Sequence, residues 1–458
     1  MKKIFASVGI VAIGASTVHA QYSPGLSSIQ TQKPWSVSAS LRGFYDDNYL
    51  TLPGNFSTGA GTAKKRASWG FEVAPSVSFN HSVEDTLMSA SYVYDLRWYE
   101  DHSVKDQTHQ FNAKLDHQFS ERYKLSVNES FVIAQEPTVL DPSVVTSPLR
   151  VPGNNIVNTG DADFFATLTK LLDFHLGYVN TVTAYQQTEG DVIGLDVPGA
   201  PGIINPAAQV SRSAALDRMD QLAIADLRWK VTDQTTGVTG YQFEHVDYTS
   251  PEYIINPPVD PALTGALAGD TEHGFPGGVK ANQRNTDSHY VFVGADEAFR
   301  PDLNGTLRVG VEYVDYYKVH QNQVSPYVDA GLTWQYTRES YIQVGVKHLH
   351  NSTDVTQLGP TSTSPVLDEE STAAYLSISH TIGDLTISAL GQAQFSDFNG
   401  GGAGNASEDF YVTGINLAYK INPFLVGEAG YNYNRLLSDL PGRTYVRNQV
   451  YVGIRATY

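Results

Sequence analysis

The last fifteen residues of the chain alternate between apolar and polar side chains up to the final residue. In residues 444–458, TYVRNQVYVGIRATY, one face carries Val450, Val452, Ile454, Ala456 and Tyr458. The other face carries Gln449, Tyr451, Gly453, Arg455 and Thr457. A period of two predicts a β-strand, and a full apolar stripe opposite a polar one is typical of a strand that crosses a membrane in a β-barrel. We therefore interpret this segment as the closing strand of such a barrel, with its apolar face outward.

The N-terminus has the features of an export signal. Lys2 and Lys3 precede an apolar stretch of about a dozen residues, and Val18-His19-Ala20 is a small-x-small cleavage site. We predict a secretory signal peptide over residues 1–20, cleaved near Ala20. We expect residues 21–34 to form a flexible periplasmic lead and residues 35–458 to form an outer-membrane β-barrel.

Between its two ends the chain repeats a rhythm of alternating segments that are joined by short turns and long loops in turn. This rhythm predicts an all-β fold, a transmembrane antiparallel β-barrel of about 18 strands with short periplasmic turns and long external loops. The predicted strands are 35–45, 68–80, 86–99, 107–119, 123–134, 158–169, 174–187, 218–231, 235–248, 287–299, 303–317, 324–336, 340–351, 371–381, 385–396, 409–420, 424–435 and 444–458. After residue 20 no apolar run reaches the roughly 18 residues that a transmembrane helix needs, which argues against a helical membrane protein.

Composition excludes several functions. The chain has no cysteine, which removes disulfides, thiolate metal sites and cysteine catalysis. Its 48 acidic residues against 30 Lys and Arg give a net charge of −18, which argues against nucleic acid as a partner. The excess of acids also predicts a weak preference for cations at a pore mouth.

The five tryptophans and the terminal aromatic mark the ends of the predicted strands. We expect Trp35, Trp229 and Trp334 at the periplasmic ends and Trp69 and Trp98 at the external ends. Aromatic girdles at both membrane interfaces produce this distribution. We interpret Tyr458 as an assembly-signal residue at the membrane boundary.

Charged residues on the polar faces form a candidate pore lining. A lipid-facing charge at the midplane costs about 2–4 kcal/mol, so these side chains are expected to face the lumen. The candidates are Arg42, Glu72, Asp95, Arg97, Lys114, Asp116, Lys124, Asp161, Asp163, Arg228, Lys230, Glu244, Arg308, Glu312, Lys347, Glu428 and Arg455. They form either a wall that keeps the pore wet or a ladder that selects a charged solute, and the sequence leaves both open.

Three loops and two strands are less regular. We expect one of the loops 249–286, 188–217 or 135–157 to fold into the mouth and narrow it, or else to pack on its neighbours outside. Strand 287–299 has apolar residues on both faces, which a bulge or an inward aromatic cluster would explain. Pro75 interrupts its predicted strand and marks a candidate bulge.

Enzyme and metal-site interpretations have weaker support. An omptin-like protease would need paired acids with an Asp/His couple at the external rim, for which the candidates are Asp46, Asp47, Asp101 and His102. Candidate calcium ligands are Asp161 with Asp163, and Asp368-Glu369-Glu370, which we expect in a solvated loop. We predict no enzyme, no cofactor and no metal site.

The signal peptide, GFYDDNYL at 43–50, the strand rhythm and the terminal VGIRATY resemble the outer-membrane β-barrel porins of Gram-negative bacteria, and among them the putative beta-barrel porin 2 family. The resemblance covers residues 35–458 as a pattern. It implies a porin-like role without naming a solute. It also implies that the terminal aromatic is read by the barrel-assembly machinery.

From these observations we expect a channel in the cell outer membrane for passive diffusion of small hydrophilic solutes. Its expected partners are outer-membrane lipid, lipopolysaccharide, the barrel-assembly machinery and the solute, and the sequence leaves a homo-oligomer open. A non-conducting structural or adhesive barrel and a soluble secreted β-sandwich binding protein are the alternatives.

Overall fold

A computed structural model of the chain describes residues 34–54, 56–58, 61–63, 65, 67–101, 105–134, 155–188, 210–255, 278–358, 364–401 and 405–458. The predicted signal peptide and all but the last residue of the predicted lead lie outside these residues. Among the described residues, no helix is long and apolar enough to cross a membrane.

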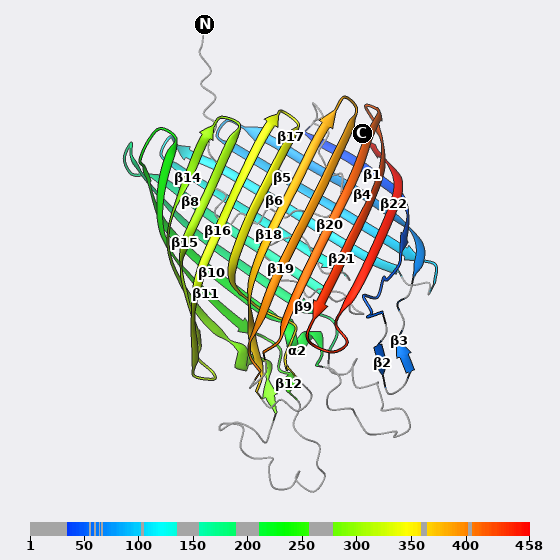
Figure 1. Ribbon diagram of the computed structural model, residues 1–458. Helices are drawn as coiled ribbons and strands as arrows, with labels where there is room; N and C mark the ends of the chain where they lie inside the picture. Colours follow the sequence, from blue (N-terminus) through cyan, green and yellow to red (C-terminus); the bar gives the residue numbers. More distant parts are fainter. Residues whose placement is uncertain are drawn as a thin grey trace.

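Eighteen antiparallel strands form one closed ring, in which each strand pairs with its neighbours along the chain (Figure 1). The strands are β1 (Trp35–Asp46), β4 (Ser68–Val83), β5 (Thr86–Tyr99), β6 (Lys105–Ser120), β7 (Tyr123–Ala134), β8 (Asn155–Thr167), β9 (Leu172–Tyr185), β10 (Arg218–Lys230), β11 (Thr235–Tyr248), β14 (Thr286–Arg300), β15 (Leu303–Tyr316), β16 (Gln321–Thr337), β17 (Ser340–Asn351), β18 (Val366–Ile382), β19 (Leu385–Gly400), β20 (Ser407–Asn422), β21 (Leu425–Ser438) and β22 (Tyr445–Thr457). The predicted fold class and the predicted count of strands are confirmed.

The ring closes between the first and the last strand. Ala39 of β1 lies opposite Ala456 of β22, and the register is unbroken from Ser38 to Asp46. The backbone N–H of Tyr458 donates to the Val37 carbonyl at 2.8 Å, and the Val37 N–H donates to the Tyr458 carbonyl at 3.0 Å. The Tyr458 ring contacts that of Trp35 with centroids 5.9 Å apart. The closure removes both sheet edges.

The two ends of the barrel differ in their connections. Turns of a few residues join the strands at the end that holds Tyr458, and the longer connections lie at the other end (Figure 1). In one short turn Gly383 takes φ +60°, a region that glycine enters without strain. The predicted bulge at Pro75 is wrong. The β4–β5 register is the same at Val73↔Leu96 and at Ser76↔Val93, so no residue is inserted between these pairs. The two residues of β4 between them, one of which is Pro75 without a backbone N–H, are not paired with β5.

The outer surface of the seam strand β22 is apolar. Val450, Val452 and Ile454 are 50%, 66% and 48% exposed, whereas Tyr451 and Arg455 on the opposite face are 8% and 5% exposed. Because the sheet is closed, the exposed face is the outside of the barrel and the buried face is the lumen. This is the alternation of a membrane-spanning strand.

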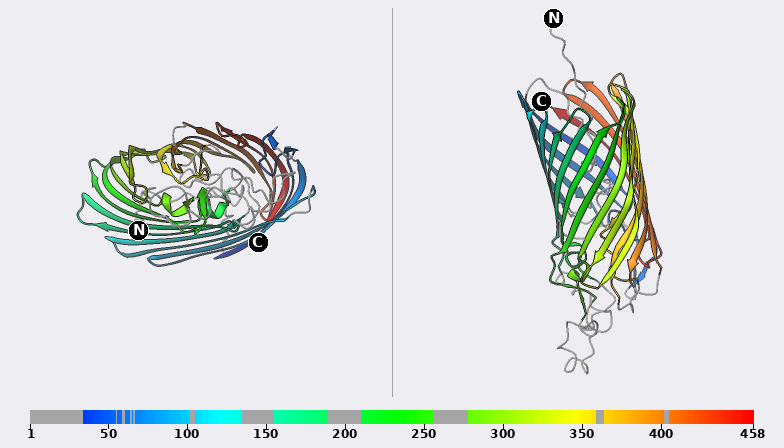
Figure 2. Two further views of the ribbon diagram at one scale, coloured as in Figure 1. Left: turned by 90° about the horizontal axis from the view of Figure 1, so that it is seen from below. Right: turned by 90° about the vertical axis from the view of Figure 1, so that its left-hand side faces the viewer.

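Short elements from two long connections lie inside the mouth. They are α2 (Arg212–Leu216), β12 (Tyr253–Ile255), β13 (Val279–Lys280) and the 3-10 helix η1 (Ala281–Arg284). Seen from the long-loop end, the ring is oval and α2 lies within it (Figure 2). A small hairpin, β2 (Phe56–Thr58) with β3 (Gly61–Ala63), follows β1.

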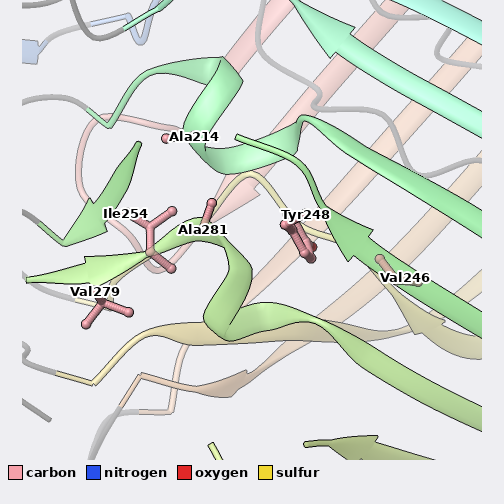
Figure 3. Packing of buried hydrophobic residues seen from close by; sticks show 6 residues of the cluster. All are labelled: Ala214, Val246, Tyr248, Ile254, Val279 and Ala281. Atoms are coloured by element: carbon pink, nitrogen blue, oxygen red, sulfur yellow. The ribbon is translucent and has the colours of Figure 1, made fainter. Parts of the chain in front are cut away.

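An apolar cluster anchors this insert. It consists of Ala214, Val246, Tyr248, Ile254, Val279 and Ala281, from both connections and the end of β11 (Figure 3). Burial of such side chains stabilises contacts by about 1.5–3 kcal/mol for a Val or Ile. The described parts of 188–217 and 249–286 therefore pack inward. Residues 135–154 lie outside the described residues.

Candidate functional site: the charged lumen

A cavity of about 230 Å³ lies in the lumen. Its wall is formed by side chains from β8 to β11 and from β14 to β18, and its roof includes Arg284 of η1. Five predicted lining residues border it: Arg228, Glu244, Arg308, Glu312 and Lys347. The lumen of the barrel is therefore lined by charged side chains on this side.

A second set of predicted residues forms an ion-pair network at the seam. Arg42 contacts Glu72 at 2.8 Å and Glu428 at 2.7 Å, and all three side chains are less than a tenth exposed. Arg455 lies 3.3 Å from the other oxygen of Glu428. Arg97 lies 3.1 Å from Glu72 and 3.3 Å from Asp95. Carboxylates and guanidinium groups alternate, so each charge has an opposite neighbour across the strands that close the ring.

The remaining predicted residues occupy other parts of the lumen. Asp116 of β6 lies 3.4 Å from the Lys114 ammonium and 3.8 Å from that of Lys124. Asn128 donates to Asp161 at 2.6 Å. Lys230, at the short-turn end of β10, is exposed and does not border the cavity.

Histidine and aspartate continue the wall beside the cavity. His175 contacts Asp163 at 2.8 Å through Nε2 and Asp226 at 2.9 Å through Nδ1. Arg228 donates to the other oxygen of Asp226 at 2.9 Å. The alternation in the sequence did not identify His175 as a partner of the lumen carboxylates, because a sequence does not show whether a histidine is neutral or charged.

Other basic side chains of the cavity are also paired with acids. Arg308 contacts Asp296 at 2.7 Å, Arg218 contacts Asp220 at 3.0 Å and Lys347 contacts Asp329 at 3.7 Å. These acids were not predicted.

Two glutamates of the cavity lack a basic partner among the described residues. The Tyr290 hydroxyl donates to Glu244 at 2.7 Å, and the backbone N–H of His350 donates to Glu312 Oε2 at 3.2 Å. Glu312 is fully buried, and its Oε1 accepts no hydrogen bond within the described part of the chain. The cavity wall thus keeps two carboxylates that no Lys, Arg or His side chain of the described ranges contacts within 4.0 Å.

An aromatic cluster lies beside these glutamates. Tyr290 and Phe292 of β14 pack on Tyr327 and Val238, while Val291 and Val293 point outward at 60% and 56% exposure. The inward aromatic cluster that we considered for strand 287–299 is confirmed. The Phe292 ring occupies the space that a side chain at Gly240 would need, so a glycine in β11 makes room for it.

A buried arginine holds the mouth insert against the wall. The Arg284 guanidinium donates to the carbonyls of Leu367 (3.0 Å), Ala215 (2.9 Å) and Thr353 (2.7 Å), and it lies over the Tyr248 ring. The three acceptors belong to β18, α2 and the β17–β18 loop. One side chain therefore fastens three connections to each other inside the mouth.

A group of ion pairs around Asp354 also joins the mouth insert to neighbouring connections. Asp354 of the β17–β18 loop pairs with Arg212 of α2 and with Arg443 of the β21–β22 loop, and Arg443 also pairs with Glu408 of β20. Burial by itself lowers the pKa of Arg443, but the carboxylates of Asp354 and Glu408 outweigh it and raise that pKa above the usual value. The Arg443 guanidinium therefore stays charged in its buried position.

The tryptophans lie near the strand ends expected from the sequence. Trp35, Trp229 and Trp334 lie toward the short-turn end and are about two-fifths exposed. Trp69 and Trp98 lie toward the long-loop end, and Trp98 stacks on Phe71 with centroids 5.3 Å apart.

Two other interpretations change. Asp368, Glu369 and Glu370 belong to β18 rather than to a solvated loop, and Asp368 is buried against His350 (3.0 Å) and Tyr316 (2.5 Å). Asp46, a weak candidate for catalysis, is fully buried and pairs with Arg447 at 2.5 Å.

Within the described ranges no group of three or more His, Cys, Asp or Glu could hold a metal ion. His102 lies outside the described residues.

A family model described as putative beta-barrel porin 2 matches residues 268–458, somewhat less than half of the chain. The predicted resemblance to this family is confirmed over these residues. No curated protein matches the chain.

Among solved structures, OpdQ of Pseudomonas aeruginosa is similar at 10% identity and a TM-score of 0.40, covering 93% of this chain and 97% of that one. OccAB4 of Acinetobacter baumannii is similar at 11% identity and a TM-score of 0.42, covering 94% of this chain and all of that one. The ferric enterobactin receptor PfeA of Pseudomonas aeruginosa is similar at 8% identity and a TM-score of 0.44, covering 92% and 80%. By its own topology the chain is a closed β-barrel of eighteen antiparallel strands, and residues 268–458 match the putative beta-barrel porin 2 family.

Proposed function

We propose that the protein is an outer-membrane channel through which small hydrophilic solutes diffuse passively. The observation that carries this proposal is the combination of a closed barrel of eighteen strands with an apolar outside and a charged lumen that contains a cavity. A barrel of 16–18 strands is wide enough for an aqueous path, whereas one of eight strands is filled by side chains.

The lumen supports a preference for cations. The seam network pairs its charges, while no basic side chain in the described part of the chain contacts the carboxylates of Glu244 and Glu312 at the cavity within 4.0 Å. Acidic side chains along a pore favour the passage of cations. The chain's excess of acids acts in the same direction.

The outer membrane is the compartment that fits this function, with lipid and lipopolysaccharide around the wall. The barrel-assembly machinery is the expected partner during insertion, and Tyr458 is the residue that we propose it reads. Extraction tests the membrane location. We expect the protein to require detergent and to migrate differently on gels with and without heating, and a protein that stays in solution without detergent would favour the soluble alternative.

Conductance in planar bilayers tests the channel. Purified protein should give stepwise currents in a simple salt solution, and the absence of currents from a folded, heat-modifiable barrel would contradict the proposal.

A non-conducting barrel that acts through its external connections is the second candidate. It is favoured by the insert of α2, η1, β12 and β13 inside the mouth. Currents from the intact barrel distinguish the two, and deletion of residues 258–280, which removes β13, tests whether the insert narrows the pore. If the insert narrows an open pore, the single-channel current should rise, and an unchanged current would show that it is not the constriction.

A further inference from the structure

The outer wall of the barrel carries a polar strip on β7 to β10. In these four strands the outward residues alternate with lumen residues, which are Ser126, Thr159, Thr181 and Asp220, and the last three of these border the cavity. The outward set includes Glu129, Asn158, Asn180 and Gln221, which we call the lateral strip. On the cross-strand register Glu129 lies opposite Gly160, Gly160 opposite Asn180, and Asn180 opposite Gln221.

The carboxylate of the lateral strip lies far from both membrane interfaces. Glu129 is in the middle of β7 (Tyr123–Ala134). Other outward-facing acids, such as Asp287 and Asp315, lie within two residues of a strand end. Ionisable groups on the lipid side of a membrane strand are costly and rare because hydrocarbon offers them no partners. An outward carboxylate at this depth therefore calls for a polar neighbour.

The strip satisfies only part of its hydrogen-bonding capacity. The Asn158 amide donates to Glu129, and the Tyr178 hydroxyl donates to the Gln221 carbonyl at 3.2 Å. Neither Asn180 nor the amide nitrogen of Gln221 donates a hydrogen bond to any described residue. The strip thus offers an acceptor, Glu129, whose only described donor is Asn158, and amide donors that have no acceptor among the described residues.

The surface around the strip allows close approach. Gly160 and Ala162 on β8 and Ala223 and Ala225 on β10 are its outward neighbours. Small residues of this kind let two membrane surfaces come near enough for side-chain hydrogen bonds. The exposed Leu176 and Val182 flank the strip on β9 and supply apolar contact.

We propose that the lateral strip is the interface between two copies of this chain in the membrane. A two-fold axis along the membrane normal reverses the order of the strands, so the β7 side of one copy meets the β10 side of the other. The acceptor and the free amide donors are then brought onto one self-complementary patch. In this arrangement the partner replaces hydrocarbon around Glu129.

Crosslinking tests this proposal directly, because the natural chain has no cysteine. A162C places a single thiol on the small-residue surface of the strip, and V452C places one on the apolar outer face of the seam. Whole cells that express each folded variant would be treated with a short membrane-permeant bis-maleimide. We expect A162C to form a band of twice the chain mass, at least about tenfold stronger than any such band from V452C.

A second thiol position and a strip variant keep the test decisive. A223C should crosslink as A162C does, and it serves if A162C does not fold. E129L with N180L and Q221L in the A162C background should reduce the dimer band severalfold. An A162C and an A223C barrel that both fold, shown by heat-modifiable migration, yet remain at monomer mass would overturn the proposal. So would equal dimer bands from A162C and V452C, or a crosslinked band whose mass shows a different protein.

Discussion

The seam and the cavity side of the barrel are built from the same alternating strands but differ in the polarity of their outer face and in the pairing of their inner charges. At the seam, β22 and β1 present Val450, Val452 and Leu41 to the outside and bury Arg42 between Glu72 and Glu428. On the cavity side, β7 to β10 carry polar groups outside, and inside, Glu244 of β11 and Glu312 of β15 contact no basic side chain of the described residues. The contrast separates charges that hold the wall together from charges that remain available to a partner or a solute.

The largest expected effect comes from breaking the seam network. R42M removes the guanidinium that Glu72 and Glu428 share and leaves them only Arg97 and Arg455 as basic partners. Leaving one partner of a buried pair fully unpaired costs about 3–5 kcal/mol, so we expect a loss near the lower end of this range. Unfolding of the reconstituted barrel in urea would measure the loss. R300A is the control, because Arg300 pairs with Asp302 at the surface, and such a pair contributes only about 0–1 kcal/mol. A loss as small as that of R300A would mean that the network does not hold the seam.

The outer face of the seam should tolerate charge poorly. V452R puts a guanidinium into lipid at a side chain that is 66% exposed, which costs about 2–4 kcal/mol near the midplane. The yield of heat-modifiable barrel in the outer membrane is the measurement. T457R, on the lumen-facing side of the same strand, is the control, and equal yields of the two variants would contradict the assigned facing.

The cavity side should behave differently at its outer face. E129L removes the outward carboxylate, so we expect the dilute, monomeric barrel in lipid to gain about 1 kcal/mol in its free energy of unfolding. E121L, in the turn before β7, should leave this free energy unchanged. If E129L destabilises the monomer, its bond with Asn158 outweighs the cost of exposing the carboxylate to lipid, and the two outer faces are more alike than proposed.

The smallest expected effect concerns the lumen of the cavity side. E244Q with E312Q removes two carboxylates that have no basic partner among the described residues, so the ratio of cation to anion permeability should fall by about twofold. The reversal potential in a salt gradient measures it. D116N is the control, because Lys114 and Lys124 already neutralise Asp116. An unchanged potential would place selectivity elsewhere in the lumen.

The strands could be predicted because a membrane wall enforces the period of two along nearly every residue. The start of β18 could not be predicted, because three consecutive acids, Asp368-Glu369-Glu370, conceal the alternation. The contacts with His350 and Tyr316 that bury Asp368 come from other strands and are not visible in the local sequence. The Arg42–Glu428 pair joins residues that lie almost the whole chain apart. Local patterns carry no information on such partners.

One further feature could have been predicted from the alternation. Leu125, Val127 and Phe131 share a face with Glu129, so the outward carboxylate follows from the pattern of β7 once outward faces are searched for charge. The mouth insert was expected only as one of two outcomes, because its anchor at Arg284 depends on carbonyls from three separate segments.

The hydrogen bonds between Val37 and Tyr458 have a consequence for the order in which we expect the barrel to fold. Contacts between residues so distant in the chain form slowly, because the entropy of a very long loop is lost before they stabilise anything. One edge of the first strand, β1, therefore stays unpaired until the last strand, β22, can pair with it. We expect closure to be the slowest step in the maturation of this barrel, and the interval before it to be when the chain is most prone to aggregation.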